Sequence, residues 1–136
     1  MNTSEQQNQR IIFLLEEDDD ARPILRRNLQ ADGYRVLLAL DEEDALERLN
    51  GNGLTADLVL VNLVNKSIEE ALGVGRKIRE KAKYDGHTPL VVIAEKYGPD
   101  LEGTDVNVES NDWITYLEDH DQLKNLLARL IPDPAV

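Results

Sequence analysis

The sequence contains no cysteine, which excludes disulfides, thiol catalysis and thiolate metal sites. It also contains no apolar run long enough to span a bilayer, because its longest runs are only as long as a β-strand. The first nine residues are polar and lack the apolar centre of a signal peptide. We therefore expect a cytoplasmic protein that does not contact a membrane.

Basic residues are scarce. The chain has 15 Lys and Arg against 27 Asp and Glu, which gives a net charge of −12 at pH 7. No local cluster of Lys and Arg interrupts this acidity. The phosphate backbone of a nucleic acid would be repelled, and so would an anionic membrane surface. We expect neither of them as a partner.

The composition that remains is that of one globular domain. With 136 residues, of which 41% are hydrophobic, the chain is long enough for a single packed core and too short for two. We place this domain at residues 10–131, between a polar tail at 1–9 and a short tail at 132–136.

Short apolar runs alternate five times with segments of helical period. Continuous runs rich in Val, Ile and Leu are typical of strands that are covered on both faces. The alternation predicts an α/β fold with a doubly wound, five-stranded parallel sheet of flavodoxin-like topology. Functional residues are then expected where the strands end. The five predicted strands are Ile11–Leu15, Tyr34–Leu40, Leu58–Val61, Leu90–Ile93 and Asp112–Tyr116.

The segments between the strands carry helix signals of unequal strength. Ser67 and Glu70 have the spacing of a capping box, and the nearby Gly73 and Gly75 indicate close helix packing rather than a phosphate-binding loop. The weakest segment is 95–109, which contains two glycines, a proline and few apolar residues. We expect a shortened or irregular fourth helix there.

Several short motifs occur in a fixed order along the chain. They are the acidic cluster Glu16–Asp20, the pair Gly33-Tyr34, Asp41–Leu46, Ala56–Val61, Pro89 and Asn111–Ile114. In this order and spacing they resemble the receiver domain of two-component response regulators, over Arg10 to about Leu130, which implies (βα)5 topology.

The resemblance implies a phosphorylation site, and this sequence departs from it. Receivers accept a phosphoryl group on an Asp after the third strand, where Asn62 stands here, and an amide is a poor nucleophile. Glu16 and Glu17 occupy the positions of the Mg²⁺-binding acidic pair. Ala94 replaces the usual hydroxyl residue, and Tyr116 replaces the usual lysine. We predict a degenerate phosphoacceptor pocket.

We therefore predict a pseudo-receiver. It would act in two-component signalling, or a phosphorelay, by phosphorylation-independent protein–protein interaction with an unidentified partner, as a non-enzyme without a cofactor. No DNA-binding effector follows the last predicted helix, so we expect output through a partner or a larger parent chain. The oligomeric state stays open.

Two alternatives belong to other functional classes. Glu16, Glu17 and Asp18 form the candidate site of a divalent-metal-binding switch or enzyme, against the simpler interpretation of a solvated loop that caps a helix. A redox or nucleotide-binding module of flavodoxin-like topology ranks lowest, because carboxylates rather than a phosphate-binding loop follow the first strand.

Three aromatic residues near the end of the chain have two interpretations. Tyr97, Trp113 and Tyr116 either form part of a partner surface or pack on the last helix. His87 and His120 lack the spacing of metal ligands, and we predict surface positions for both.

Overall fold

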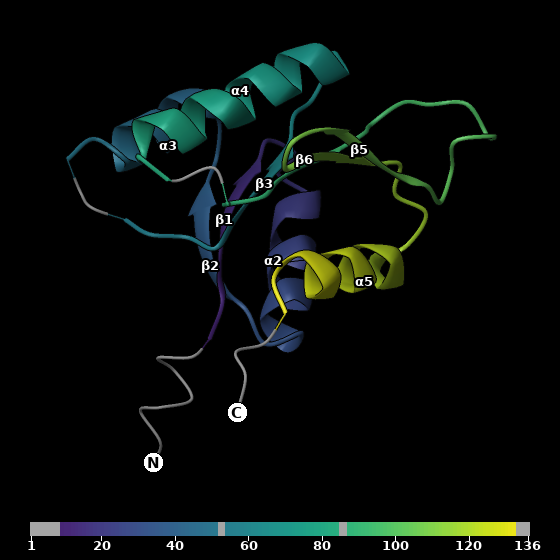
Figure 1. Ribbon diagram of the computed structural model, residues 1–136, viewed down its shortest axis with the longest axis horizontal. Helices are drawn as coiled ribbons and strands as arrows, with labels where there is room; N and C mark the ends of the chain where they lie inside the picture. The colour runs from purple at the N-terminus through teal and green to yellow at the C-terminus, as the bar shows by residue number, and fades with distance from the viewer. Residues whose placement is uncertain (1–8, 52–53, 85–86, 133–136) are drawn as a thin grey trace.

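A computed structural model describes residues 9–51, 54–84 and 87–132, so most of both predicted tails lies outside the described residues. Its six strands form one sheet in the order β2-β1-β3-β4-β6-β5 (Figure 1). All neighbouring strands are parallel except the last pair, β6 and β5. The strands are β1 (Ile11–Glu16), β2 (Arg35–Ala39), β3 (Leu58–Asn62), β4 (Leu90–Ile93), β5 (Asp105–Glu109) and β6 (Asp112–Thr115).

Helices cover both faces of this sheet. Figure 1 shows α3 (Glu42–Arg48) and α4 (Ile68–Lys81) on one face, and α2 (Ala21–Ala31) and α5 (His120–Leu130) on the other. Side chains alternate along β1, so that Phe13 and Leu15 belong to the core under α3 and α4, whereas Ile12 and Leu14 belong to the core under α2 and α5. A strand buried on both faces must be apolar throughout, which explains the continuous run.

Side-chain caps begin three of the four helices, α3, α4 and α5. Ser67 and Glu70 form the predicted capping box at the start of α4. The N-cap residue of α2 has no such bond, but in the turn before it Asp18 Oδ1 accepts hydrogen bonds from the N–H groups of Asp20 and Ala21 at 2.9 and 3.3 Å. The packing interpretation of the helical glycines is confirmed at Gly75, where a Cβ atom would come within 2.3 Å of Leu90. Gly73 faces open space instead.

The α/β flavodoxin-like fold and its five parallel strands are confirmed, but a sixth, antiparallel strand stands where an irregular fourth helix was expected. In the described segment 94–112 the chain turns and then forms β5, which pairs antiparallel with β6. Gly103 has a φ of +83°, which breaks a helix at little cost. The alternation of polar and apolar residues from Asp105 to Glu109 then suits a strand.

Side chains fasten this hairpin to the rest of the domain. Asp105 Oδ1 accepts hydrogen bonds from Thr115 Oγ1 at 2.7 Å and from Gln122 Nε2 at 2.9 Å. Gln122 lies in α5, so the hairpin is tied to the helix that follows it.

None of the helices in the described part of the chain is long and apolar enough to cross a membrane.

Candidate functional site

The centre of the candidate site is a contact between the ends of two neighbouring strands. Glu16 ends β1 and Asn62 ends β3, and the parallel register places them side by side. Asn62 Nδ2 donates hydrogen bonds to both carboxylate oxygens of Glu16, at 2.9 and 3.0 Å. Glu16 has no exposed surface. A carboxamide therefore supplies the side-chain hydrogen bonds of a fully buried acid.

Burial determines the acidity of this carboxyl group. Removal from water raises the pKa of Glu16 above its ordinary value of 4.5. The hydrogen bonds from the Asn62 amide and from the Asp18 N–H act in the opposite direction, because they stabilise the ionised form. The net effect is a raised pKa, so Glu16 holds its proton more tightly than an exposed glutamate does.

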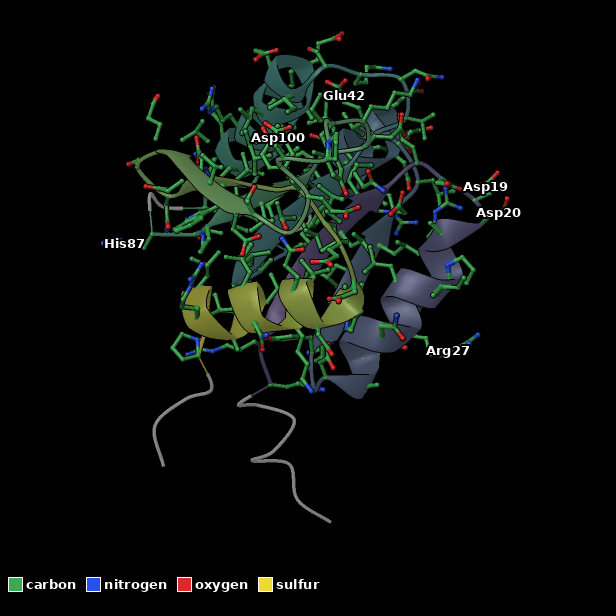
Figure 2. All side chains as sticks on the ribbon, turned by 90° about the vertical axis from the view of Figure 1, so that its right-hand side faces the viewer. Asp19, Asp20, Arg27, Glu42, His87 and Asp100 are labelled. Atoms are coloured by element: carbon green, nitrogen blue, oxygen red, sulfur yellow. The ribbon has the colours of Figure 1, made fainter. Side chains whose placement is uncertain are left out.

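The acidic loop after β1 is held by its own backbone and by one arginine. Arg22 Nε donates to the Glu16 carbonyl at 2.9 Å, and its guanidinium pairs with Asp19 at 2.7 Å. Glu17 Oε1 accepts the Val64 N–H at 2.8 Å, which connects this loop to the loop after β3. Asp19 and Asp20 project into solvent beside the start of α2 (Figure 2).

These contacts do not assemble the acidic residues into a metal site. Within the described ranges, no group of three or more His, Cys, Asp or Glu side chains is placed to hold an ion. Glu16 faces Asn62, Glu17 contacts Val64, and Asp18 accepts the Asp20 N–H in the turn before α2. Each of the three candidate carboxylates thus has a structural partner of its own.

Ala94 and Tyr116 follow β4 and β6 at the same edge of the sheet. Ala94 is buried, and its N–H donates to the Thr115 carbonyl at 3.0 Å. The Tyr116 ring meets Tyr97 edge to face, with ring centres 5.5 Å apart. The Tyr97 hydroxyl in turn donates to the Leu117 carbonyl. A methyl group therefore follows β4, where no hydroxyl is offered, and an aromatic ring rather than a cation follows β6.

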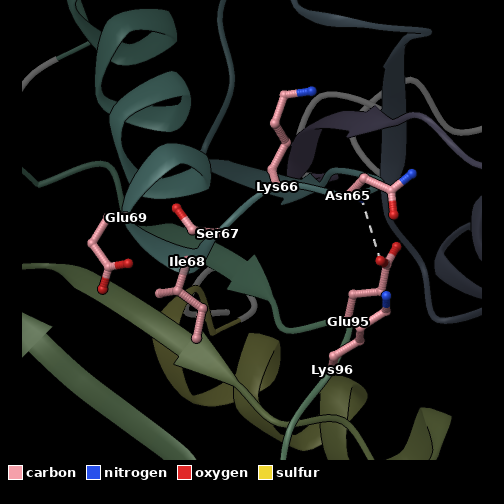
Figure 3. Close-up of a pocket in the computed structure, with 7 residues that line it drawn as sticks. All are labelled: Asn65, Lys66, Ser67, Ile68, Glu69, Glu95 and Lys96. Atoms are coloured by element: carbon pink, nitrogen blue, oxygen red, sulfur yellow. Dashed lines mark hydrogen bonds between the residues drawn. The ribbon is translucent and has the colours of Figure 1, made fainter.

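Two hollows adjoin this edge. One, of about 300 Å³, lies between α2 and α5, with Glu16 and Asn62 in its wall beside apolar residues such as Leu25 and Leu117. The other, of about 520 Å³, lies between the loops after β3 and β4 (Figure 3). Its lining combines two lysines and two glutamates with Asn65, Ser67 and Ile68. The Asn65 N–H donates to Glu95 Oε1 across this second hollow at 3.3 Å.

The three predicted partner-surface aromatics do not share one surface. Tyr97 and Tyr116 pack against the core on the α3 and α4 face. Trp113 packs against the core on the opposite face, where Arg129 of α5 lies 5.5 Å from its ring centre. Trp113 thus packs on the α2 and α5 side of the sheet, because residues an odd number of positions apart on a strand point to opposite faces. The partner surface stays a prediction for all three aromatic residues.

Sequence reasoning missed a second buried carboxylate. Asp112, at the start of β6, is 2% exposed and pairs with Arg76 and Arg79 of α4, each at 2.8 Å. Asp112 and Arg76 are 36 positions apart in the sequence, so no short-range pattern indicates that they pair. His120 is also placed differently from the prediction, because it is partly buried and its Nε2 lies 2.7 Å from Asp32 Oδ2. His87 is exposed as predicted.

Response regulators and receiver domains are among the solved structures that this chain resembles. The chain resembles the chemotaxis protein CheY4 of Vibrio cholerae with a TM-score of 0.64 and 18% identity, over 90% of this chain and 99% of that one. It resembles the receiver domain of the hybrid histidine kinase CckA with a TM-score of 0.58 and 27% identity, over 89% and 97%. It also resembles the response regulator TrrA of Thermotoga maritima, solved in complex with Mg²⁺ and BeF. The TM-score is 0.62 and the identity is 23%, over 90% of this chain and 99% of TrrA. No family model and no curated protein sequence matches the chain.

Proposed function

We propose that this protein is a pseudo-receiver that signals by binding a protein partner without being phosphorylated. The receiver fold supports a place in response-regulator signalling. The observation that carries the rest is the Asn62 amide at the end of β3, where it donates to both oxygens of buried Glu16. A receiver would need a free carboxylate there, facing a bound cation.

The surroundings of Asn62 support the same proposal. Phosphoryl transfer depends on positioning and on cations or donors that stabilise the charge of the transferring group. Ala94 offers only a methyl group after β4, and the Tyr116 ring packs against Tyr97 after β6. Glu16 and Glu17 are already engaged by Asn62 and Val64. The chain thus keeps the receiver scaffold without the groups that transfer a phosphoryl group.

The direct test is incubation with acetyl phosphate and Mg²⁺, followed by intact-mass measurement. TrrA, which was solved with Mg²⁺ and BeF, serves as the positive control under the same conditions. We expect no phosphorylated species of this chain. Mg²⁺ with beryllofluoride should also leave the amide resonances of Glu17, Asn62 and Leu63 unshifted. A stoichiometric mass increase on the native chain would overturn the proposal.

Asn62→Asp tests whether one substitution restores the reaction. We expect this variant to remain unphosphorylated by acetyl phosphate, because Ala94 still lacks the hydroxyl and Tyr116 still lacks the positive charge that the reaction needs at these positions. The same mass measurement checks it, after circular dichroism has shown that the variant is folded at the assay pH. Phosphorylation of Asn62→Asp would show that the pocket lacks the acceptor alone.

Dependence on Mg²⁺ provides an independent readout. An active receiver crowds several carboxylates into one pocket, and the cation relieves their repulsion. With a neutral side chain at Asn62, we expect millimolar Mg²⁺ to change the melting temperature of the native chain very little. A rise of many degrees would contradict the proposal, whereas a calcium or manganese isotherm with tight stoichiometric binding would favour the cation-switch alternative.

A further inference from the structure

β5 is an edge strand of the sheet. β5 is the last strand of the sheet, so one side of its backbone has no neighbouring strand among the residues that the structure describes. Figure 1 shows it at the edge farthest from β2. Four of its five residues are exposed. Such an edge presents free N–H and C=O groups to which another extended chain can bind.

Exposed apolar side chains are concentrated at this edge. Of five large exposed apolar residues in the described chain, three lie within or just before β5, namely Leu101, Val106 and Val108. Val106 pairs with Ile114, whose side chain packs on the α3 and α4 face, and directly opposed residues share a face. A receiver with a helix between its last two strands would cover this side of the sheet. Here the valines remain in water.

The strand is nevertheless held in place before any partner arrives. The bond from Thr115 to Asp105 and the bond from Gln122 to Asp105 fix its first residue. At its far end, Asn107 Nδ2 donates to the carbonyls of Ser110 and Asp112 at 3.2 and 3.1 Å, which closes the hairpin turn. A partner would therefore not have to order this strand, which lowers the entropic cost of binding.

The charge around this edge has one sign. The 27 residues from Tyr97 to Leu123 contain eight Asp or Glu and no Lys or Arg. Asp112 is neutralised by Arg76 and Arg79. Glu102 and Glu109 are exposed on either side of the two valines. An occupant of this edge must therefore carry positive charge at its ends and apolar side chains between them.

We propose that β5 binds an extended, basic segment of a protein partner, which adds to the sheet as a seventh strand. Backbone hydrogen bonds to β5 supply affinity, and apolar side chains against Val106 and Val108 supply specificity. Lys or Arg residues of the segment lie near Glu102 and Glu109. This inference rests on the proposed function, since it names the surface through which the pseudo-receiver binds its partner.

A second copy of this chain is a poor occupant for the same edge. An antiparallel pair of β5 strands centred on Asn107 would place Asp105 opposite Glu109 twice. Like charges directly opposite each other destabilise a sheet, and each copy carries a net charge of −12. The bulge between Asn107 and Glu109 further disfavours a long, flat self-pairing. Pairing between the β5 strands of two copies is thus disfavoured, whereas pairing of β5 with a basic strand is not.

The test uses the full chain, labelled with ¹⁵N, and a synthetic peptide that carries lysines at both ends and valines between them. We expect saturable shifts of the amide resonances from Asp105 to Glu109, together with slower hydrogen exchange along β5. A peptide with glutamate in place of lysine should produce no saturable shift. No saturation with the basic peptide, or shifts centred elsewhere on the chain, would overturn the proposal.

The matched variants distinguish specific peptide binding at β5 from non-specific binding to exposed apolar residues. The pair Val106→Lys and Val108→Lys should weaken peptide binding about tenfold or more, since it removes both apolar contacts and adds repulsion. Ile24→Lys, at an exposed apolar residue of α2, should leave binding unchanged. An equal loss in Ile24→Lys would overturn the inference. So would a dimer of the native chain, seen by sedimentation, that the two valine substitutions dissociate.

The two proposals fail in different ways in these experiments. Shifts at Glu17, Asn62 and Leu63 on addition of Mg²⁺ and beryllofluoride would contradict the pseudo-receiver proposal, whatever the peptide does. If these three resonances do not shift and the peptide does not bind β5, only the strand-addition proposal is contradicted.

Discussion

The domain buries one carboxylate at each end of its sheet, and the two are stabilised differently. Glu16, at the end of β1, is fully buried and receives hydrogen bonds only from the neutral Asn62 amide and the Asp18 N–H. Asp112, at the start of β6, is almost as deeply buried but contacts two guanidinium groups. A buried charge needs either an opposite charge or several donors.

This difference shows where the fold is sensitive. At Asp112 the charges of Arg76 and Arg79 compensate the carboxylate directly. Among the described residues no side-chain cation forms an ion pair with the Glu16 carboxylate, and burial raises its pKa. The Glu16 end should therefore respond to any new charge and, to a smaller extent, to pH, whereas the Asp112 end should respond mainly to loss of the ion pairs.

The largest effect is expected for Asn62→Asp. It replaces the donor by a second carboxylate in contact with Glu16, and an uncompensated buried charge costs about 3–5 kcal/mol. We expect a loss of that size in the free energy of unfolding at pH 7, measured by urea denaturation. The loss should shrink as the pH falls, because protonation of either carboxyl group restores a donor.

Asn62→Ala is the matched control for this substitution. It removes the donor without adding a charge, so it should cost only about 1.5–3 kcal/mol, the range for a hydrogen bond to a charged group. Equal losses for the two variants at pH 7 would show that charge repulsion at Glu16 is unimportant.

A smaller loss is expected for Asp112→Ala. Arg76 and Arg79 are partly exposed and can turn to solvent once their partner is gone, so we expect about 1.5–3 kcal/mol in the same urea measurement. The control is Glu42→Ala, which breaks the exposed ion pair between Lys77 and Glu42 and should cost less than about 1 kcal/mol. Equivalent losses would contradict the distinction between buried and surface ion pairs here.

The smallest effect is the pH dependence due to Glu16 itself. Since the pKa of Glu16 is raised in the folded state, the folded protein binds more protons than the unfolded chain from about pH 4.5 upward. The stability of the native chain should therefore fall relative to Glu16→Gln as the pH rises through this window. Parallel urea titrations of both proteins from pH 4 to 7 measure it, and a native stability that stays constant or rises relative to Glu16→Gln with increasing pH would contradict the burial of Glu16.

The sequence predicted most of the sheet because its signals are local. Ile11–Leu15 and Leu58–Val61 are continuous apolar runs, and only a strand covered on both faces requires such a run. The Ser67 and Glu70 cap is equally local, since both residues lie within one helical turn. The same reasoning placed Glu16 and Asn62 at the carboxyl edge, because parallel strands all end there.

The hairpin could have been found from the sequence, but the helix expectation concealed it. Asp105–Glu109 alternates polar and apolar residues, and Ser110 and Asn111 are turn-forming residues before the next strand. The breakers Gly98 and Gly103 were interpreted as interruptions of a helix. They allow the turns that lead into a new strand.

The sequence by itself thus determined the order of strands and helices, the buried faces and the residues that gather at the carboxyl edge. Only the tertiary structure decided how those residues are paired: Glu16 with the Asn62 amide, Asp112 with two arginines of α4, and β5 with β6. These contacts join residues tens of positions apart. Such pairs depend on how the helices and strands pack in space, and short-range periodicity in the sequence does not indicate which distant residues will meet.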